Sequence, residues 1–455
     1  MLELRAAHAA IKREEFGAAW TIANKYLNDH PESPEALYLL GACLRASDNL
    51  GLALTVLSKA LSKDQKQANL WMTYAATLHD LNRWADSEEA FLIVHKMLPD
   101  DPMPPANIGA THVQRGRWRE AINWCDKALK IDTDSHIARI SKGFACLALG
   151  RWTDAWQYAE TLYGNHLQIR VYNTPDKEEP RWDGSPGKTV VVQCDQGVGD
   201  IIMFAQLIPR MQAVCKQVII ECAPRLVGMF TRCFPGTVVY GTLKDQFLTW
   251  PQDHEIDASI HISFLGKLYL NRDKDFERKA YLTPDPELLK KWLGWLEQFP
   301  KPWIGVTWRG GIQQTQTHLR SLNLEDLAPI LEHKGTFFDL SYHDSAAEVA
   351  KWNIDHATQI VKPPLGVKDY DDTIALIAAL DKVATVTTTV AHVCGALGRK
   401  ACVLVPDVAQ WRYAYQFEGG TQMLWYPPDS VRLYRQKGGE SWEPAIKRLA
   451  GALHA

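Results

Sequence analysis

The sequence predicts a helical repeat solenoid followed by two Rossmann-like α/β domains. Two observations carry this prediction. In the first third of the chain, small and bulky residues recur at fixed positions every 34 residues. After about residue 166 that period ends, and short apolar strands begin to alternate with helices. The 455 residues leave room for two or three domains, so the change of period is expected to separate folding units.

Three series of residues define the repeat. The bulky position is occupied by Phe16, Leu50, Trp84, Trp118 and Trp152. Small residues recur in step with it at two other positions, namely Ala7, Gly41, Ala75, Gly109 and Gly143, and Ala19, Ala53, Ser87, Ala121 and Ala155. Small residues let paired helices approach closely, and the bulky side chain fills the space beside them. A 34-residue period of this kind is typical of tetratricopeptide repeats, whose arrays present concave surfaces to extended partners.

The domain boundaries follow from composition and period. We expect repeats over residues 1–166 and a linker rich in turn-forming residues over 167–187. The first α/β domain is expected over 188–283 and the second over 284–455. Ligands of two such domains favour the cleft between them and the carboxyl ends of their strands.

Both α/β domains are predicted from apolar strands that alternate with helices. The expected strands lie at 189–194, 217–222 and 237–240 in the first domain, and at 303–308, 336–341, 383–387 and 401–405 in the second. Because these runs are apolar throughout rather than alternating, they indicate parallel sheets covered on both faces.

Composition excludes several classes of protein. The formal net charge is −3, so no bulk attraction to nucleic acid or anionic membrane is expected. No run of 18 apolar residues occurs, and the charged N-terminus has no signal-peptide core, so neither a membrane span nor secretion is expected. The nine cysteines occur singly and without a CxxC pair, which indicates reduced core thiols in a cytoplasmic protein and no metal site.

The first candidate site is the turn after the strand at 189–194. Gly197 and Gly199 let backbone amides approach a ligand, and Asp200 follows at the start of the next helix. Asp200 has two interpretations. It is either a cap for the free helix amides, or a carboxylate able to take a proton from an acceptor hydroxyl.

The second candidate site lies in the second α/β domain. Thr388 and Thr389 belong to a run of three threonines between a strand and a helix, and His392 lies one turn into that helix. Hydroxyls and free amides at a helix N-terminus suit a phosphate, although capping is the alternative. Arg309 ends another strand beside two glycines, where a guanidinium can bind a diphosphate or remain a surface charge.

Longer motifs carry a family resemblance that covers almost the whole chain. They are Arg181–Pro186, Gln196–Asp200, Asp371–Thr373 with Ala378–Asp381, Val390–His392 with Gly395–Gly398, and Trp425–Pro427 leading to Arg432–Gln436. Together they resemble bacterial proteins that join tetratricopeptide repeats to a glycosyltransferase module of the GT-B fold, related to the lipopolysaccharide heptosyltransferases. The layout is also similar to that of the O-linked N-acetylglucosamine transferases.

The resemblance implies sugar transfer from a nucleotide-diphosphate donor, without a metal or other cofactor. By this likeness Asp200 matches the aspartate proposed as general base, and Arg309, Thr388, Thr389 and His392 match the donor-binding segments. Thr387 departs from the pattern, because heptosyltransferases usually have an aspartate there. A catalytically inactive, transferase-like scaffold that binds protein partners is therefore the alternative. The repeats favour a polypeptide acceptor, while a glycan or a nucleic acid remains open.

Overall fold

The computed structural model describes residues 2–163, 180–243, 248–311, 317–332, 334–364 and 369–454. Contacts divide the chain into two compact units, Met1–Cys146 and Leu147–Ala455. This division falls before the expected end of the repeats at residue 166. Residues 167–179 of the expected linker lie outside the described part, and the boundaries expected at 166, 187 and 283 stay predictions.

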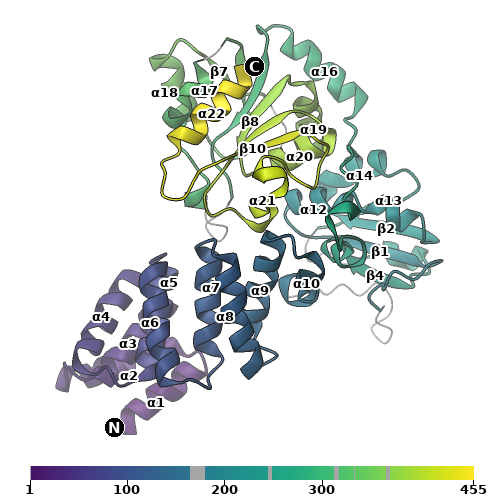
Figure 1. Cartoon of the computed structure of the whole chain (residues 1–455). Coiled ribbons are helices and arrows are strands. Elements are labelled where there is room, and N and C mark those ends of the chain that lie inside the picture. Colours follow the sequence, from purple (N-terminus) through teal and green to yellow (C-terminus); the bar gives the residue numbers. More distant parts are fainter. Residues whose placement is uncertain are drawn as a thin grey trace. The chain divides into compact units, whose positions relative to one another are not determined.

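The first unit is a stack of helices, each of which packs on the next along the chain (Figure 1). The helices are α1 (Leu2–Lys12), α2 (Phe16–Asp29), α3 (Pro34–Ala46), α4 (Leu50–Lys63), α5 (Ala68–Asp80), α6 (Trp84–Met97), α7 (Met103–Gln114) and α8 (Trp118–Ile131). Helix α9 (His136–Ala148) runs across the division between the units. The predicted tetratricopeptide-repeat stack is confirmed.

The repeat positions explain the packing of the helices. The bulky residue of each repeat is the first residue of α2, α4, α6 and α8. At Gly41 in α3, a Cβ atom would lie 2.5 Å from Cγ of Leu57 in α4. At Gly109 in α7, it would lie 2.5 Å from Sγ of Cys125 in α8. The helices therefore approach closely because these positions carry no side chain.

The turns of the stack repeat with the same period. Residues in the left-handed region, with φ between 59° and 68°, stand two positions before each bulky residue: Glu14, Asp48, Asn82, Gly116 and Gly150. A left-handed residue ends a helix and reverses the chain into the next one. The sequence pattern hid this series, because only two of its members are glycine.

The second unit begins with two short helices, α10 (Trp152–Trp156) and α11 (Ala159–Tyr163). Their side chains belong to the core of this unit. Nε1 of Trp156 donates to the backbone oxygen of Leu270 at 2.6 Å, and Nε1 of Trp152 donates to Oδ1 of Asp273 at 2.7 Å. The fifth bulky repeat position, Trp152, therefore packs within the α/β unit.

The first α/β domain contains a four-stranded parallel sheet in the order β3-β2-β1-β4. Its main elements are β1 (Thr189–Cys194), α12 (Val198–Ala205), α13 (Ile208–Gln212), β2 (Gln217–Cys222), α14 (Val227–Cys233), β3 (Val238–Gly241), β4 (Ala258–His261) and α15 (Leu265–Tyr269). The three expected strands are present. Strand β4 was not predicted, because Ser259 and His261 interrupt the apolar run by which the other strands were recognised.

The second α/β domain contains a six-stranded parallel sheet in the order β10-β9-β8-β5-β6-β7. Its strands are β5 (Trp303–Thr307), β6 (Thr336–Asp339), β7 (Ile360–Val361), β8 (Lys382–Val386), β9 (Ala401–Val405) and β10 (Val431–Arg435). Its helices are α16 (Pro286–Leu296), α17 (Ala328–Leu331), α18 (Ala346–Asp355), α19 (Tyr370–Ala379), α20 (Thr389–Leu397), α21 (Trp411–Ala414) and α22 (Glu443–His454).

The fold is therefore a helical repeat stack followed by two Rossmann-like α/β domains, as predicted. In each sheet the chain starts in the middle, adds strands toward one edge, and then crosses to the other side. The order reverses between β1 and β4 in the first sheet, and between β5 and β8 in the second. Such switch points are where open parallel sheets bind ligands, at the carboxyl ends of the strands.

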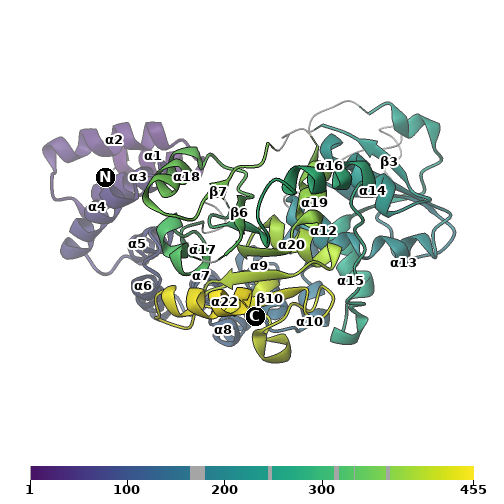
Figure 2. The same cartoon turned by 90° about the horizontal axis from the view of Figure 1, so that it is seen from above.

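The two α/β domains touch within the second unit. Helix α12 packs against α20, and α14 packs against α19 (Figures 1 and 2). Arg232 of α14 forms an ion pair with Asp371 of α19, a residue from one of the family-like motifs. Its neighbour Asp372 accepts a hydrogen bond from Nε1 of Trp292 at 2.8 Å. These two aspartates are thus tied into the packing of α14, α16 and α19.

Candidate functional site

The switch point of the second sheet gathers two of the predicted segments. Arg309 and Gly310 follow β5, and Thr387 to Thr389 follow β8. A Cβ atom at Gly310 would lie 2.9 Å from Cγ2 of Thr388 and 3.3 Å from the backbone oxygen of Thr387. Segments nearly 80 residues apart therefore meet because their strands are neighbours in the sheet.

Thr388 is the N-cap of α20. Its hydroxyl accepts a hydrogen bond from the backbone N–H of Val390 at 3.3 Å, and its Oγ1 lies 3.0 Å from Oγ1 of Thr385. Capping is thus one function of this threonine. The positive end of the α20 dipole lies at the same place, so an anion would be stabilised beside Thr388 and Thr389.

His392 is a buried neutral side chain in this structure. Its Nδ1 lies 2.7 Å from the hydroxyl of Tyr426, and its Nε2 lies 3.0 Å from the hydroxyl of Tyr413. Burial lowers the pKa of His392 to about 4, and the nearby Asp200 carboxylate opposes this only in part. At neutral pH His392 therefore brings hydrogen bonds, not positive charge, to α20.

Gly199 joins the two predicted sites. A Cβ atom at this glycine would lie 3.1 Å from Cδ2 of His392 and 3.4 Å from Oγ1 of Thr389. Gly197 is the N-cap of α12, and Asp200 lies in the first turn of that helix. The N-terminal turns of α12 and α20 consequently face each other, which the sequence alone did not predict.

Asp200 has a cationic partner that sequence analysis missed. Nε of Arg412, from the short helix α21, donates to Oδ1 of Asp200, and both side chains are largely buried. Burial acts to lower the pKa of Arg412, but the Asp200 carboxylate, together with Tyr163 and Tyr413, raises it, and the net pKa lies above its ordinary value. Because 212 positions separate the two residues, no local pattern could have revealed the pair.

The arginines after β5 have different surroundings. Nη2 of Arg309 lies 2.9 Å from Oε2 of Glu348 in α18, and 42% of the Arg309 side chain is exposed. Arg320 is buried, and its Nη1 donates to the backbone oxygen of Thr387 at 3.1 Å. Burial lowers the pKa of Arg320 from its ordinary value. One exposed and one buried guanidinium therefore lie on the segments that meet at this switch point.

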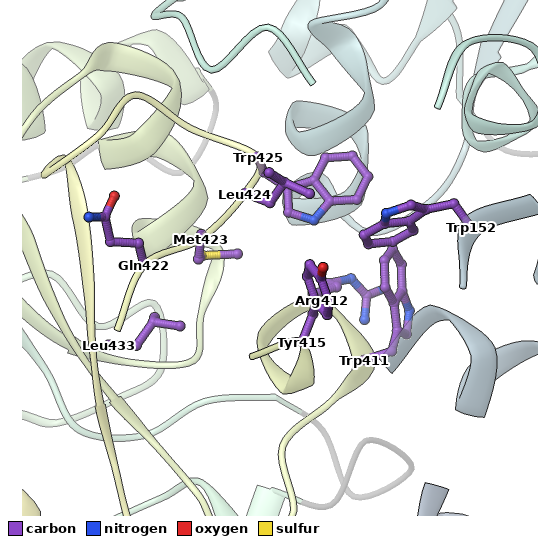
Figure 3. A pocket seen from close by; sticks show the side chains of 9 residues that line it. All are labelled: Trp152, Trp411, Arg412, Tyr415, Gln422, Met423, Leu424, Trp425 and Leu433. Carbon is purple, nitrogen blue, oxygen red and sulfur yellow. The ribbon is translucent and has the colours of Figure 1, made fainter. Parts of the chain in front are cut away.

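A small pocket lies beside Arg412 and is drawn in Figure 3. Its cavity volume is about 10 Å³, roughly the room that one water molecule needs and far below the roughly 300–1,000 Å³ of small-molecule sites. Figure 3 shows the indoles of Trp152, Trp411 and Trp425 on one side and Gln422, Met423 and Leu433 on the other. This pocket is too small for a nucleotide sugar and lies among the aromatic side chains that hold α10.

Neither a metal centre nor a membrane span is found in the described residues. No group of three or more His, Cys, Asp or Glu side chains there is arranged to hold a metal ion. None of the helices described is both long enough and apolar enough to cross a membrane.

Comparisons with known proteins agree with this architecture. Residues 12–92 match the family model of anaphase-promoting complex, cyclosome, subunit 3. The chain is 27% identical over 448 residues to Protein FlbA of Caulobacter vibrioides, which covers 93% of this chain and 73% of FlbA. The similarity to FlbA therefore extends through the repeats and both α/β domains.

Solved structures match parts of the chain. PilF of Pseudomonas aeruginosa is 18% identical and covers 37% of this chain and 76% of its own, with a TM-score of 0.33. A thermophilic tetratricopeptide-repeat protein of Thermus thermophilus is 17% identical and covers 36% of this chain and 90% of its own, with a TM-score of 0.32.

Proposed function

We propose that this protein is a metal-independent glycosyltransferase that moves a sugar from a nucleotide-diphosphate donor to an acceptor, most simply a polypeptide. One observation carries the proposal. The segments after β5 and β8 meet at the switch point of the second sheet, and Thr389 and His392 of the second segment approach Gly199 in the N-terminal turn of α12 from the first α/β domain. Anion-binding groups of one domain thus lie next to a carboxylate of the other. The GT-B resemblance of the sequence supports the same function.

In this proposal the donor diphosphate binds at the N-terminus of α20. The dipole of α20, the hydroxyls of Thr388 and Thr389, and the guanidinium of Arg309 stabilise its negative charge. When the bond between the sugar C1 and the diphosphate oxygen breaks, the electron pair stays on the diphosphate. Groups that hold this charge without reorganising lower the barrier, which replaces the role a metal ion plays in other transferases.

His392 fits this role as a neutral group. With its ring between Tyr413 and Tyr426, it fixes the first turn of α20 and keeps Thr389 against Gly199. We propose that Gly197 and Gly199 allow the acceptor and the donor sugar to approach the α12 backbone closely. The sequence nominates Asp200 as the proton acceptor, and the ion pair with Arg412 is evidence for an electrostatic role of this carboxylate.

The repeat stack gives the acceptor its place in this proposal. Repeat arrays bind extended chains on their surfaces, so a polypeptide segment suits them best. A scaffold without transferase activity is the second candidate, because Thr387 replaces the aspartate of the resembled family. Thr387 is buried, and its backbone oxygen is held by Arg320, so its side chain is not available to a donor.

A binding and turnover experiment tests the proposal. We expect uridine, guanosine, adenosine or cytidine diphosphate to raise the melting temperature, because a ligand that binds only the folded state stabilises it. The protein is then incubated with the sugar esters of the nucleotides that bind, and release of nucleoside diphosphate is measured. Binding without any release would favour the scaffold. Absence of binding by all four would overturn the transferase.

A further inference from the structure

A second carboxylate stands at the other switch point of the unit. Asp195 is the first residue after β1, and His261 is the last residue of β4. These strands are parallel neighbours, with Gln193 opposite His261 in register. The order of the sheet reverses between them, so both residues lie where a doubly wound sheet binds its ligand.

Asp195, His261 and Ser263 form a hydrogen-bonded chain. Nε2 of His261 contacts Oδ1 of Asp195, and Nδ1 of His261 lies 2.7 Å from Oγ of Ser263. The backbone N–H of Ser263 also donates to Nδ1 at 3.3 Å. In this arrangement Nδ1 of His261 faces Ser263 and Nε2 faces the carboxylate of Asp195, so the ring is held in a fixed orientation.

Burial shows which member of this chain can meet a substrate. His261 is 2% exposed and Ser263 is completely buried, so the serine hydroxyl has no access to a ligand. The Asp195 side chain is 27% exposed. The buried imidazole and serine therefore support a carboxylate that reaches the surface at the carboxyl ends of β1 and β4.

Asp200 is less suited to accept a proton. Its partner Arg412 is largely buried, so protonation of Asp200 would leave a buried guanidinium without its counter-charge. A buried charge without a counter-charge is strongly unfavourable. Asp195 is the more accessible of the two carboxylates, because 27% of its side chain is exposed, against 17% of the Asp200 side chain.

We propose that Asp195, oriented by His261 and Ser263, binds the acceptor hydroxyl and accepts its proton during sugar transfer. This inference rests on the proposed transferase function. The acceptor oxygen forms a bond to the sugar C1, its proton passes to Asp195, and the C1–O bond to the diphosphate breaks with its electron pair on the diphosphate. Asp195 then releases the proton to water. Asp200 acts as the counter-charge that holds Arg412 beside α20.

The test compares Asp195→Asn with a matched control. Asp257 precedes β4, and its Oδ2 accepts from the backbone N–H of Thr189 at 2.8 Å, at the opposite end of the same strand pair. Asp257→Asn therefore reports on damage to the sheet. Nucleoside-diphosphate release is measured with UDP-N-acetylglucosamine, UDP-glucose, GDP-mannose and ADP-heptose, water serving as acceptor, and calorimetry measures donor affinity.

The expected result is specific to proton transfer. Asp195→Asn should lower kcat by ~10²–10⁴, the usual contribution of a general base, with donor affinity unchanged within a factor of about two. It should also remove the loss of rate on the acidic side of the pH profile. Asp257→Asn should retain the rate and the profile of the native protein.

The outcomes separate the two proposals. If the native protein releases diphosphate from none of the four donors, the transferase function fails and the role of Asp195 fails with it. If the native protein is active and Asp195→Asn keeps more than half its rate, only this inference is overturned. A large loss of kcat in Asp200→Asn, with Asp195→Asn unaffected, would assign the proton to Asp200.

Discussion

Arg309 is the residue whose charge the proposed donor site depends on most directly. We expect Arg309→Ala to weaken nucleoside-diphosphate binding by about 1.5–3 kcal/mol, the range for a hydrogen bond to a charged group. Stability should change little, because Glu348 keeps hydrogen bonds from Nε1 of Trp308 and the backbone N–H of Leu324. Isothermal titration calorimetry measures the affinity.

Lys301 provides the matched control for Arg309. It precedes the same strand, β5, at the amino end of the sheet, and its exposed Nζ lies 3.7 Å from Oδ1 of Asp381. Lys301→Ala removes a similar surface charge far from the carboxyl ends of the strands. If both substitutions weakened nucleoside-diphosphate binding equally, the net charge of the protein would account for binding, and not a site at the carboxyl end of β5.

His392 makes the stability of the second unit depend on pH. Its pKa is lowered to about 4 in the folded chain, below the ordinary 6.5, so the unfolded chain binds the proton more tightly. The stability that the neutral His392 contributes is therefore fully present above pH 6.5, and it is lost as the pH falls toward 4. Between pH 7 and pH 5 we expect His392 to account for a loss of about 2 kcal/mol.

The measurement compares the native chain with His392→Gln, which cannot be charged. Chemical denaturation gives the unfolding free energy of both proteins at pH 7 and pH 5. The difference between the native chain and the variant should be smaller at pH 5. The NMR signal of His392 is the histidine signal that is absent from the spectrum of the variant. In the native protein this signal should not shift between pH 8 and pH 5. A signal that moves with a midpoint near 6.5 would contradict the buried neutral state.

At the scale of elements, the close approach of helices in the repeats gives a sharp prediction. Gly41→Ala places a Cβ atom 2.5 Å from Cγ of Leu57, so α3 and α4 must separate. We expect a loss of about 1–3 kcal/mol, the usual cost of overpacking a core. The control is Gly51→Ala in α4, where no heavy atom lies within 4 Å of the added Cβ. That change should be neutral or stabilising by up to ~1 kcal/mol.

Circular dichroism during thermal unfolding measures the stability of the repeat stack in both variants. The interpretation of Gly41 as a packing position would be wrong if the two alanines had the same effect.

The ion pair between α14 and α19 links the two α/β domains. Arg232 donates from Nη1 to Oδ2 of Asp371 at 3.0 Å, and Asp371 is 4% exposed. Arg232→Ala leaves a buried carboxylate without its partner, so we expect a loss of about 3–5 kcal/mol. Lys447→Ala, which breaks an exposed pair with Glu443 on α22, should cost less than about 1 kcal/mol.

Denaturant titrations of the two variants measure these losses. Replacing Arg232 and Asp371 together by leucine should recover much of the stability, because no uncompensated charge remains. Equal losses in the Arg232 and Lys447 variants would show that burial does not strengthen the pair.

At the scale of the whole molecule, the position of a truncation decides whether the α/β unit folds. A chain that begins at Leu147 keeps Trp152 and Trp156, which are buried within that unit. A chain that begins after residue 166 loses both, and each buried tryptophan contributes about 3–5 kcal/mol. We expect the first chain to fold and bind nucleoside diphosphate with native affinity, and the second to be aggregated or strongly destabilised.

Size-exclusion chromatography and calorimetry distinguish the two truncations. The shorter deletion should also lower transfer to a polypeptide acceptor while leaving diphosphate release to water intact, because the repeats are proposed to bind the acceptor. Native transfer rates without residues 1–146 would show that the repeats have another function.

The sequence by itself determined the elements and the repeat. The 34-residue series from Phe16 to Trp118 marks the start of alternate helices because helix pairing imposes local, periodic packing. The apolar runs at 189–194 and 401–405 form the strands expected of them, since burial on both faces requires an apolar run throughout. The turns at Gly199 and Thr388 were also recognisable, because glycines and hydroxyls follow strands there.

Only the tertiary structure decided which of these residues meet. Arg412 pairs with Asp200, and Asp195 with His261, through strand order and helix contacts that bring together positions 212 and 66 residues apart. The same contacts place Trp152 in the α/β unit although it belongs to the repeat series. A periodic sequence pattern reflects packing between residues that are close to each other in the chain. The partner of a charged group or of a proton acceptor is set by the tertiary fold, and it can lie far away in the sequence, so no local pattern reveals it.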